Sequence, residues 1–195
     1  GIKTFLNAAK TFIDNAPQNN HDIDILTSGQ QTVEIGKNLS PSDAKTELKK
    51  LKRSNRWTNQ NTFLRKVLSD AIDRANKSNP VAKGGVRQVF LFSDGLESDQ
   101  TIDQSDIDQI VENAIEYGVQ VHFFLYAANK ELTQKEIDNY DLIASISEKT
   151  GGKLITFDRY EVKTKNNLQN GAKEIARGVN KKVRLTLDFC GITSK

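Results

Sequence analysis

Apolar and polar positions along the chain follow two spacings, one typical of helices and one typical of strands. Apolar residues three and four positions apart predict amphipathic helices at residues 2–14, 41–51, 63–72, 107–117, 136–149 and 165–180. Short apolar or alternating runs predict strands at residues 22–26, 32–35, 86–92, 119–126, 153–157 and 183–189. The first two strands flank Ser28-Gly29-Gln30 and are expected to form a hairpin.

From residue 86 onward, strands and helices alternate, which predicts a parallel sheet with helices on both faces. The run VHFFLY at residues 121–126 is nearly continuous in apolar character, as expected of a strand covered on both faces. The predicted fold class is therefore α/β, with a doubly wound, mostly parallel central sheet. Residues 1–182 are assigned to one α/β domain, and residues 183–195 to a C-terminal strand or tail.

Composition narrows the classes of function. The chain has 195 residues, of which 36% are hydrophobic and 27% charged, and its formal net charge is only +3. This weak charge does not favour nucleic acid as a partner, and no stretch approaches the ~20 apolar residues that span a bilayer. A single cysteine excludes an internal disulfide, and two histidines are too few for a histidine-based zinc site. His122, within the apolar run, is expected to be packed or hydrogen-bonded in its strand.

Candidate chemistry follows the strand at residues 86–92, where the apolar run ends in Ser93-Asp94-Gly95. Ligands of open α/β sheets bind outside the carboxyl ends of the strands, where Asp94 is expected. Nearby oxygen-bearing side chains suit a hard cation such as Mg²⁺, Ca²⁺ or Mn²⁺. They belong to Ser93, Glu97, Ser98, Asp99 and Asp103. The alternative is a plain turn at Asp94-Gly95, with Asp103 and Asp106 capping the next helix.

A second segment, WTNQNTFLRKVL, places Thr58 in a loop before a long helix. Together with Ser93-Asp94-Gly95, this loop resembles the von Willebrand factor A domain. The metal-ion-dependent adhesion site of that family combines Asp-x-Ser-x-Ser, a threonine loop and an Asp that commonly stands in Thr-Asp-Gly or Ser-Asp-Gly. The resemblance implies a non-enzymatic protein-binding module in which Asp94 and Thr58 hold Mg²⁺ or another divalent cation. An acidic group of a partner protein completes the coordination, and the expected contact residues are Trp57, Ser93, Gly95 and Glu97.

The chain departs from the family at its beginning. The family starts with a central strand and its Asp-x-Ser-x-Ser loop, whereas this chain starts at the helix that follows them. One explanation is that the strand precedes residue 1, which agrees with the absence of methionine. The other is a circular permutation, in which VRLTLDFCGITSK fills the central slot and Asp188 serves as a metal ligand. We favour the first, with residues 183–189 pairing at an edge or leading into another domain, because their apolar positions alternate and a central strand should be apolar throughout.

Two other functions stay open. A Mg²⁺-dependent hydrolase or phosphoryl-transfer enzyme could use Asp94 on the same doubly wound fold, although the sequence has no Gly-rich phosphate loop and no nucleophile elbow. A purely structural domain with a degenerate metal site is the third hypothesis. Trp57 has an alternative role, packing its loop onto the sheet edge. Abundant Lys, Asn, Gln and Ile suggest a bacterial source, with the periplasm, the cell surface and the cytoplasm all open as compartments.

Overall fold

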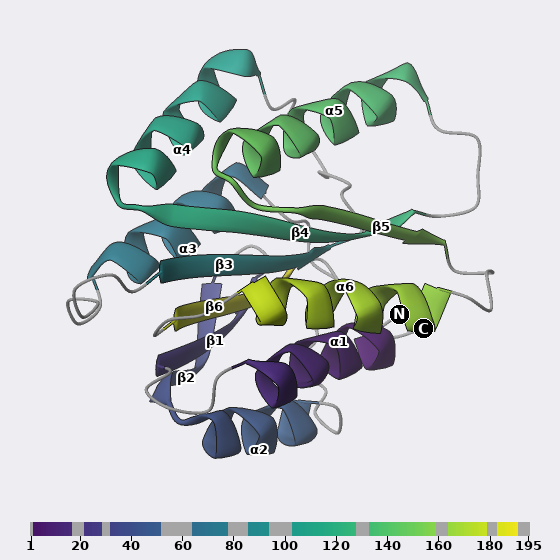
Figure 1. The fold of residues 1–195 in the computed structure, drawn as a ribbon. Helices are drawn as coiled ribbons and strands as arrows, with labels where there is room; N and C mark the ends of the chain where they lie inside the picture. The colour runs from purple at the N-terminus through teal and green to yellow at the C-terminus, as the bar shows by residue number, and fades with distance from the viewer. Residues whose placement is uncertain are drawn as a thin grey trace.

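The structure is a computed structural model that describes residues 2–16, 22–28, 32–51, 64–77, 86–93, 103–127, 133–158, 164–178 and 183–190 (Figure 1). The helices are α1 (Ile2–Asn15), α2 (Pro41–Leu51), α3 (Leu64–Lys77), α4 (Gln104–Glu116), α5 (Gln134–Lys149) and α6 (Thr164–Gly178). The strands are β1 (Asp22–Ser28), β2 (Thr32–Leu39), β3 (Val86–Ser93), β4 (Val119–Ala127), β5 (Leu154–Asp158) and β6 (Val183–Cys190). Each helix and strand predicted from the periodicity is confirmed, with bounds shifted by a few residues. No helix within these ranges is both long and apolar enough to cross a membrane.

The strands form one six-stranded sheet in the order β2-β1-β6-β3-β4-β5. The pairs β1–β6, β6–β3, β3–β4 and β4–β5 are parallel. The pair β1–β2 is antiparallel, which confirms the predicted hairpin. The fold class is therefore α/β, with parallel strands joined by helices and one antiparallel strand at an edge.

β6 pairs on both of its sides. Leu187 is level with Ile25 of β1 and with Phe90 of β3, and all three strands run in the same direction. The expectation that residues 183–189 pair at an edge is therefore wrong. That expectation relied on alternating side chains, whereas backbone pairing decides the position of the strand. An empty slot between β1 and β3 would leave a row of unpaired N–H and C=O groups on each, and β6 satisfies both rows.

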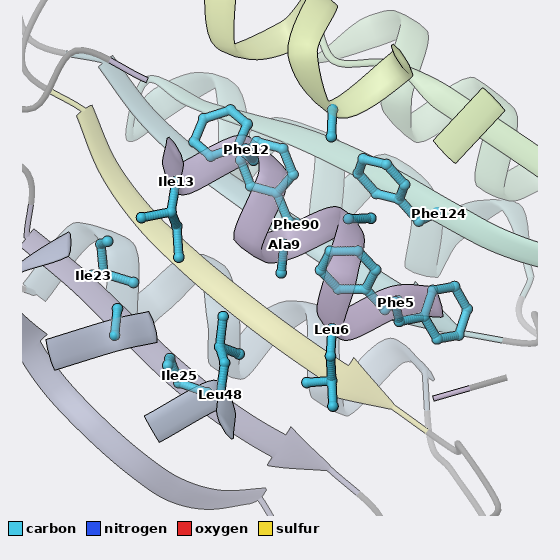
Figure 2. Packing of buried hydrophobic residues seen from close by; sticks show 14 of the residues in the cluster. Phe5, Leu6, Ala9, Phe12, Ile13, Ile23, Ile25, Leu48, Phe90 and Phe124 are labelled. Carbon is cyan, nitrogen blue, oxygen red and sulfur yellow. The ribbon is translucent and has the colours of Figure 1, made fainter. Parts of the chain in front are cut away.

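Helices cover both faces of the sheet (Figure 1). Along β3, Phe90 and Phe92 join the apolar cluster of α1, α2 and α6, and Figure 2 shows Phe12 and Phe90 within it. Val89 and Leu91 join the opposite cluster, which includes α3, α4 and α5. Contacts between aromatic rings stabilise the first cluster. In one of them, the ring centroids of Phe12 and Phe90 are 4.6 Å apart. Alternate residues of β3 are thus buried on opposite faces, as its continuous apolar sequence predicts.

The edge strand β2 is irregular. Its register with β1 shifts twice, between Ile23 and Ile25 and again between Ile25 and Leu26. Near the first shift, Asn38 has a φ of 50°, and its N–H donates to a carboxylate oxygen of buried Asp24 at 2.7 Å. Shifts of this kind bend and twist an edge strand, and so hinder pairing with a strand of another molecule.

Candidate functional site

The carboxyl ends of the parallel strands meet at one edge of the sheet. Ser28, the last residue of β1, is level with Cys190, the last residue of β6. On the other side of β6, Phe189 is level with Phe92, so β3 and β6 end together. This edge is the place where ligands of open α/β sheets bind, and we call it the carboxyl edge.

Most of the predicted site residues lie outside the residues that the structure describes. They are Thr58, Asp94, Trp57, Gly95 and Glu97. Ser93 is described as the last residue of β3, and only 2% of its surface is exposed. Its side chain is therefore packed within the protein at the carboxyl edge. The role of Ser93 in partner binding stays a prediction.

Asp188 lies inside β6, two residues before the strand ends at Cys190. Its backbone is level with Leu26 of β1 and with Leu91 of β3, and both leucines are fully buried. At about 3.3 Å per residue, this position is roughly 7 Å short of the end of the strand. The family resemblance implied a loop position after the strand, so the placement of Asp188 differs from that pattern. Metal ligation by Asp188 stays a prediction.

The helices that follow the two predicted site loops contact each other at their first turns. α3 follows the segment that contains Thr58, and α4 follows the segment that contains Asp94. Arg65 Nη1 of α3 lies 2.7 Å from Asp106 Oδ1 of α4, with side-chain exposures of 55% and 16%. The two helices also share one apolar cluster. The structure therefore brings together the first turns of α3 and α4.

The start of α4 is fixed by its own cap. Asp103 is the N-cap, and its Oδ1 accepts a hydrogen bond from the N–H of Asp106 at 2.9 Å. This confirms the predicted capping by Asp103. Asp106 has a different role, because its carboxylate pairs with Arg65 instead of capping the helix. This pair was not predicted from the sequence. A signal was present, since α3 carries Arg65 in its first turn and no acidic residue there.

Metal-ligating side chains do not cluster within the described ranges. No group of three His, Cys, Asp or Glu residues there could hold an ion. The predicted cation site is not tested by this finding, because Asp94 and Thr58 lie in other segments. Strand ends and helix starts are the described elements at the carboxyl edge. The first turns of helices have N–H groups without a partner in the helix, and these groups favour negative charge.

His122 of β4 is packed and hydrogen-bonded, as predicted. It is 3% exposed, its ring stacks on Phe90 at 4.7 Å, and its Nδ1 accepts a hydrogen bond from the N–H of Lys153 at 3.1 Å. Burial, and then the positive charge of Lys153, lowers the pKa of His122 to about 3. The imidazole is therefore neutral at pH 7 and carries its proton on Nε2. That proton has no hydrogen-bond partner among the residues described.

A polar groove of about 330 Å³ lies between β2 and α3. Its lining residues are Thr32, Lys37, Asp70, Asp73, Arg74 and Lys77. Several of them are already paired across the groove: Thr32 donates to Asp70 at 2.9 Å, and Arg74 pairs with Glu34. These contacts hold α3 against the edge strand. This groove was not predicted from the sequence.

No protein-family model and no curated protein matches the sequence.

Proposed function

We propose that the chain is a non-enzymatic protein-interaction domain of the von Willebrand factor A type, with a doubly wound sheet whose elements follow a permuted order. Asp94 and Thr58 hold Mg²⁺ or another divalent cation at the carboxyl edge, with Asp188 as a further candidate ligand. An acidic side chain of another protein completes the coordination. The cation then supplies the charge complementarity of the interface.

The position of β6 carries this proposal. The family places its first strand in the centre of the sheet and follows it with an amphipathic helix. Here β6 occupies the central place between β1 and β3, although it comes last in the sequence. Counted from β6 and then from the first residue onward, the elements run β6, α1, β1, β2 and so on, which is the family order.

The direction of β6 supports the same assignment. Figure 2 shows β6 pointing from the end of α1 that carries Phe12 toward the end that carries Phe5. β6 therefore ends on the side where α1 begins, as a strand does when the next helix of a strand–helix–strand unit follows it. The family's first loop would join these two ends, at the carboxyl edge where Asp94 follows β3.

The test is a calorimetric titration of the whole chain with Mg²⁺. We expect the wild-type chain to bind Mg²⁺ and Asp94→Ala to bind at least tenfold more weakly, with both proteins melting at similar temperatures. Asp108→Ala is the matched control, because Asp108 is an exposed carboxylate on α4 and is expected to leave binding unchanged. Equal binding by wild type and Asp94→Ala, or no binding by either, would refute the cation site.

An enzyme assay separates the proposal from the hydrolase hypothesis. We expect no turnover of phosphate esters or nucleotides in the presence of Mg²⁺. Turnover that disappears in Asp94→Ala, and persists in Asp108→Ala, would assign Asp94 to catalysis and overturn the interaction function.

A further inference from the structure

Helices on the two faces of the sheet carry opposite charge. α4 and α5 together have eight acidic and two basic residues. α1, α2 and α6, which cover the opposite face, have eight basic and four acidic residues (Figure 1). The formal net charge of the whole chain is only +3. Because α4 and α5 lie between α2 and α6 in the sequence, the fold is what separates the two signs of charge.

Both faces have charged side chains without a hydrogen-bond or ion-pair partner among the residues that the structure describes. On α4 and α5 we call them the acidic surface: Glu112, Glu116, Asp141 and Glu148. On α1, α2 and α6 we call them the basic surface: Lys10, Lys49, Lys173 and Arg177. Carboxylates near the basic surface are largely neutralised, since Asp14 pairs with Lys45 and Glu47 pairs with Lys50. Each surface therefore holds charge that the rest of the described chain leaves uncompensated.

The acidic surface is unfavourable for α4 itself. Glu112 and Glu116 are four residues apart, so their like charges repel each other on one side of the helix. Glu116 is the last residue of α4, where the C=O groups without a partner carry partial negative charge and favour a cation. α2, α3, α5 and α6 each have a basic residue in the last turn, whereas α4 has none. Helix stability therefore does not explain these carboxylates.

An exposed apolar side chain lies within the acidic surface. Ile115 is 59% exposed, more than any other large apolar side chain of the described residues. It comes three residues after Glu112 and directly before Glu116, so the three side chains lie on one side of the last turns of α4. An apolar side chain bordered by charged ones is typical of a protein interface. This arrangement favours a protein surface over a metal ion as the occupant.

We infer that the acidic surface docks on the basic surface of a second copy of this chain. The two surfaces are complementary, because each has four charged side chains of one sign that lack a partner. They lie on opposite sides of the sheet, so a single copy does not bring its own two surfaces together (Figure 1). This inference does not depend on the proposed cation site.

The position of the two surfaces determines the kind of assembly. The contact joins different surfaces of two copies, so it is heterologous and leaves one surface of each kind free at the ends of a dimer. A third copy can dock in the same way. We therefore expect short open-ended chains, whose length rises with protein concentration.

The experiment is sedimentation velocity on the whole chain over a series of concentrations, in about 20 mM and about 300 mM NaCl. We expect the weight-average mass to rise with protein concentration at low salt and to stay at the monomer value at high salt. The reason is that the Debye length falls from roughly 20 Å to roughly 6 Å between these conditions, which screens contacts between exposed charges.

Two double variants reverse the surfaces one at a time. Glu112→Lys with Glu116→Lys reverses the acidic surface, and Lys10→Glu with Arg177→Glu reverses the basic surface. Each should associate at least tenfold more weakly than wild type, because like charges then oppose each other. The first should melt no lower than wild type, since a lysine suits the end of α4. Mixed in equal amounts, the two variants should associate again, because each supplies the surface that the other has reversed.

Matched controls test whether charge and apolar area act at these positions. Glu34→Lys with Asp73→Lys changes the net charge by the same amount as the first double variant, at exposed positions on β2 and α3 outside both surfaces. Ile115→Ser changes no charge and should weaken association about tenfold, by the loss of buried apolar area. Val33→Ser removes a side chain that is 50% exposed on β2 and should leave association unchanged.

The outcomes decide the inference. Salt-sensitive association of wild type that both double variants lose, their mixture regains and the Glu34, Asp73 control keeps supports docking between copies. Wild type that stays monomeric at low salt up to roughly 1 mM overturns it. If that monomer instead binds an oligolysine peptide, the acidic surface belongs to a basic partner and the inference is also overturned. An equal loss in the Glu34, Asp73 control overturns it too, because net charge in general would then explain the effect.

Discussion

His122 is expected to make the protein lose stability in acid. Its neutral ring is buried against Phe90 and accepts a hydrogen bond from the backbone of Lys153. The folded chain lowers the pKa of His122 from 6.5 to about 3. In the unfolded chain the imidazole takes up its proton as the pH falls through 6.5, whereas in the folded chain it stays neutral until about pH 3. The contribution of the neutral His122 to the free energy of unfolding is therefore fully present above pH 6.5. It is lost progressively as the pH falls from 6.5 to 3.

The size of the loss follows from the shift. Each pH unit within this window removes about 1.4 kcal/mol of unfolding free energy, which gives roughly 5 kcal/mol over the whole window. Between pH 7.5 and pH 4.5 the expected loss from His122 is about 3 kcal/mol. That is a large part of the ~5–15 kcal/mol that stabilises an ordinary domain.

Urea unfolding at pH 7.5 and pH 4.5 measures this loss for wild type and for His122→Gln. The glutamine oxygen can still accept a hydrogen bond, but it does not titrate. Carboxylate contributions are common to both proteins, so wild type should lose about 3 kcal/mol more than the variant between the two pH values. Equal losses in the two proteins would refute the reasoning, because His122 would then titrate alike in the folded and unfolded chains.

Two further substitutions test the packing of the core and a third tests the cap of α4, each by chemical unfolding at pH 7.5. Gly152→Ala should cost about 1–3 kcal/mol or more, because an added Cβ would overlap the carbonyl oxygen of Val121. Phe90→Ala should cost about 3–5 kcal/mol, because it empties the centre of a cluster that holds several aromatic rings. Asp103→Ala should cost about 1 kcal/mol, because it removes the acceptor for the N–H of Asp106 at the start of α4.

Two control variants show whether these losses are specific. Gly118 has a φ of 63°, and an added Cβ would meet no atom beyond its chain neighbours within 4 Å, so Gly118→Ala should cost only the backbone strain, about 1–2 kcal/mol. Ile137→Ala removes a side chain that is 39% exposed and should cost less than Phe90→Ala. A Gly152→Ala variant no less stable than Gly118→Ala would contradict the close approach of the chain to β4. A Phe90→Ala variant as stable as Ile137→Ala would contradict the position of Phe90 in the core.

Local sequence patterns were sufficient to locate the elements, but not to place β6 in the sheet. Residues of α1 or β4 reveal their structure through their own spacing, because each element buries a periodic apolar face. The neighbours of a strand depend on backbone groups elsewhere in the chain, which its own residues do not encode. Alternation in Val183–Cys190 suggested an edge, yet the unfilled hydrogen bonds of β1 and β3 determine its central place.

The candidate site likewise has one part that the sequence predicts and another part that it does not. Asp94 and Thr58 were predicted as site residues from their residue types and from their places in the sequence. Asp94 follows a predicted strand, and Thr58 precedes a predicted helix. The contact between Arg65 and Asp106 was not predicted, because 41 positions separate them and only packing of α3 on α4 brings them together. The position of Asp188 within β6 also depends on register, which the alternating sequence left undetermined.

The place of β6 has a consequence for synthesis on the ribosome. Among the described strands, β6 alone joins β1 and β2 on one side to β3, β4 and β5 on the other. Because β6 follows the other five described strands in the sequence, these two partial sheets are translated before it, and each has an open edge. Until β6 inserts, a nascent chain exposes the backbone N–H and C=O groups that pair readily with other chains, so translation that stops before residue 183 should yield an aggregation-prone product.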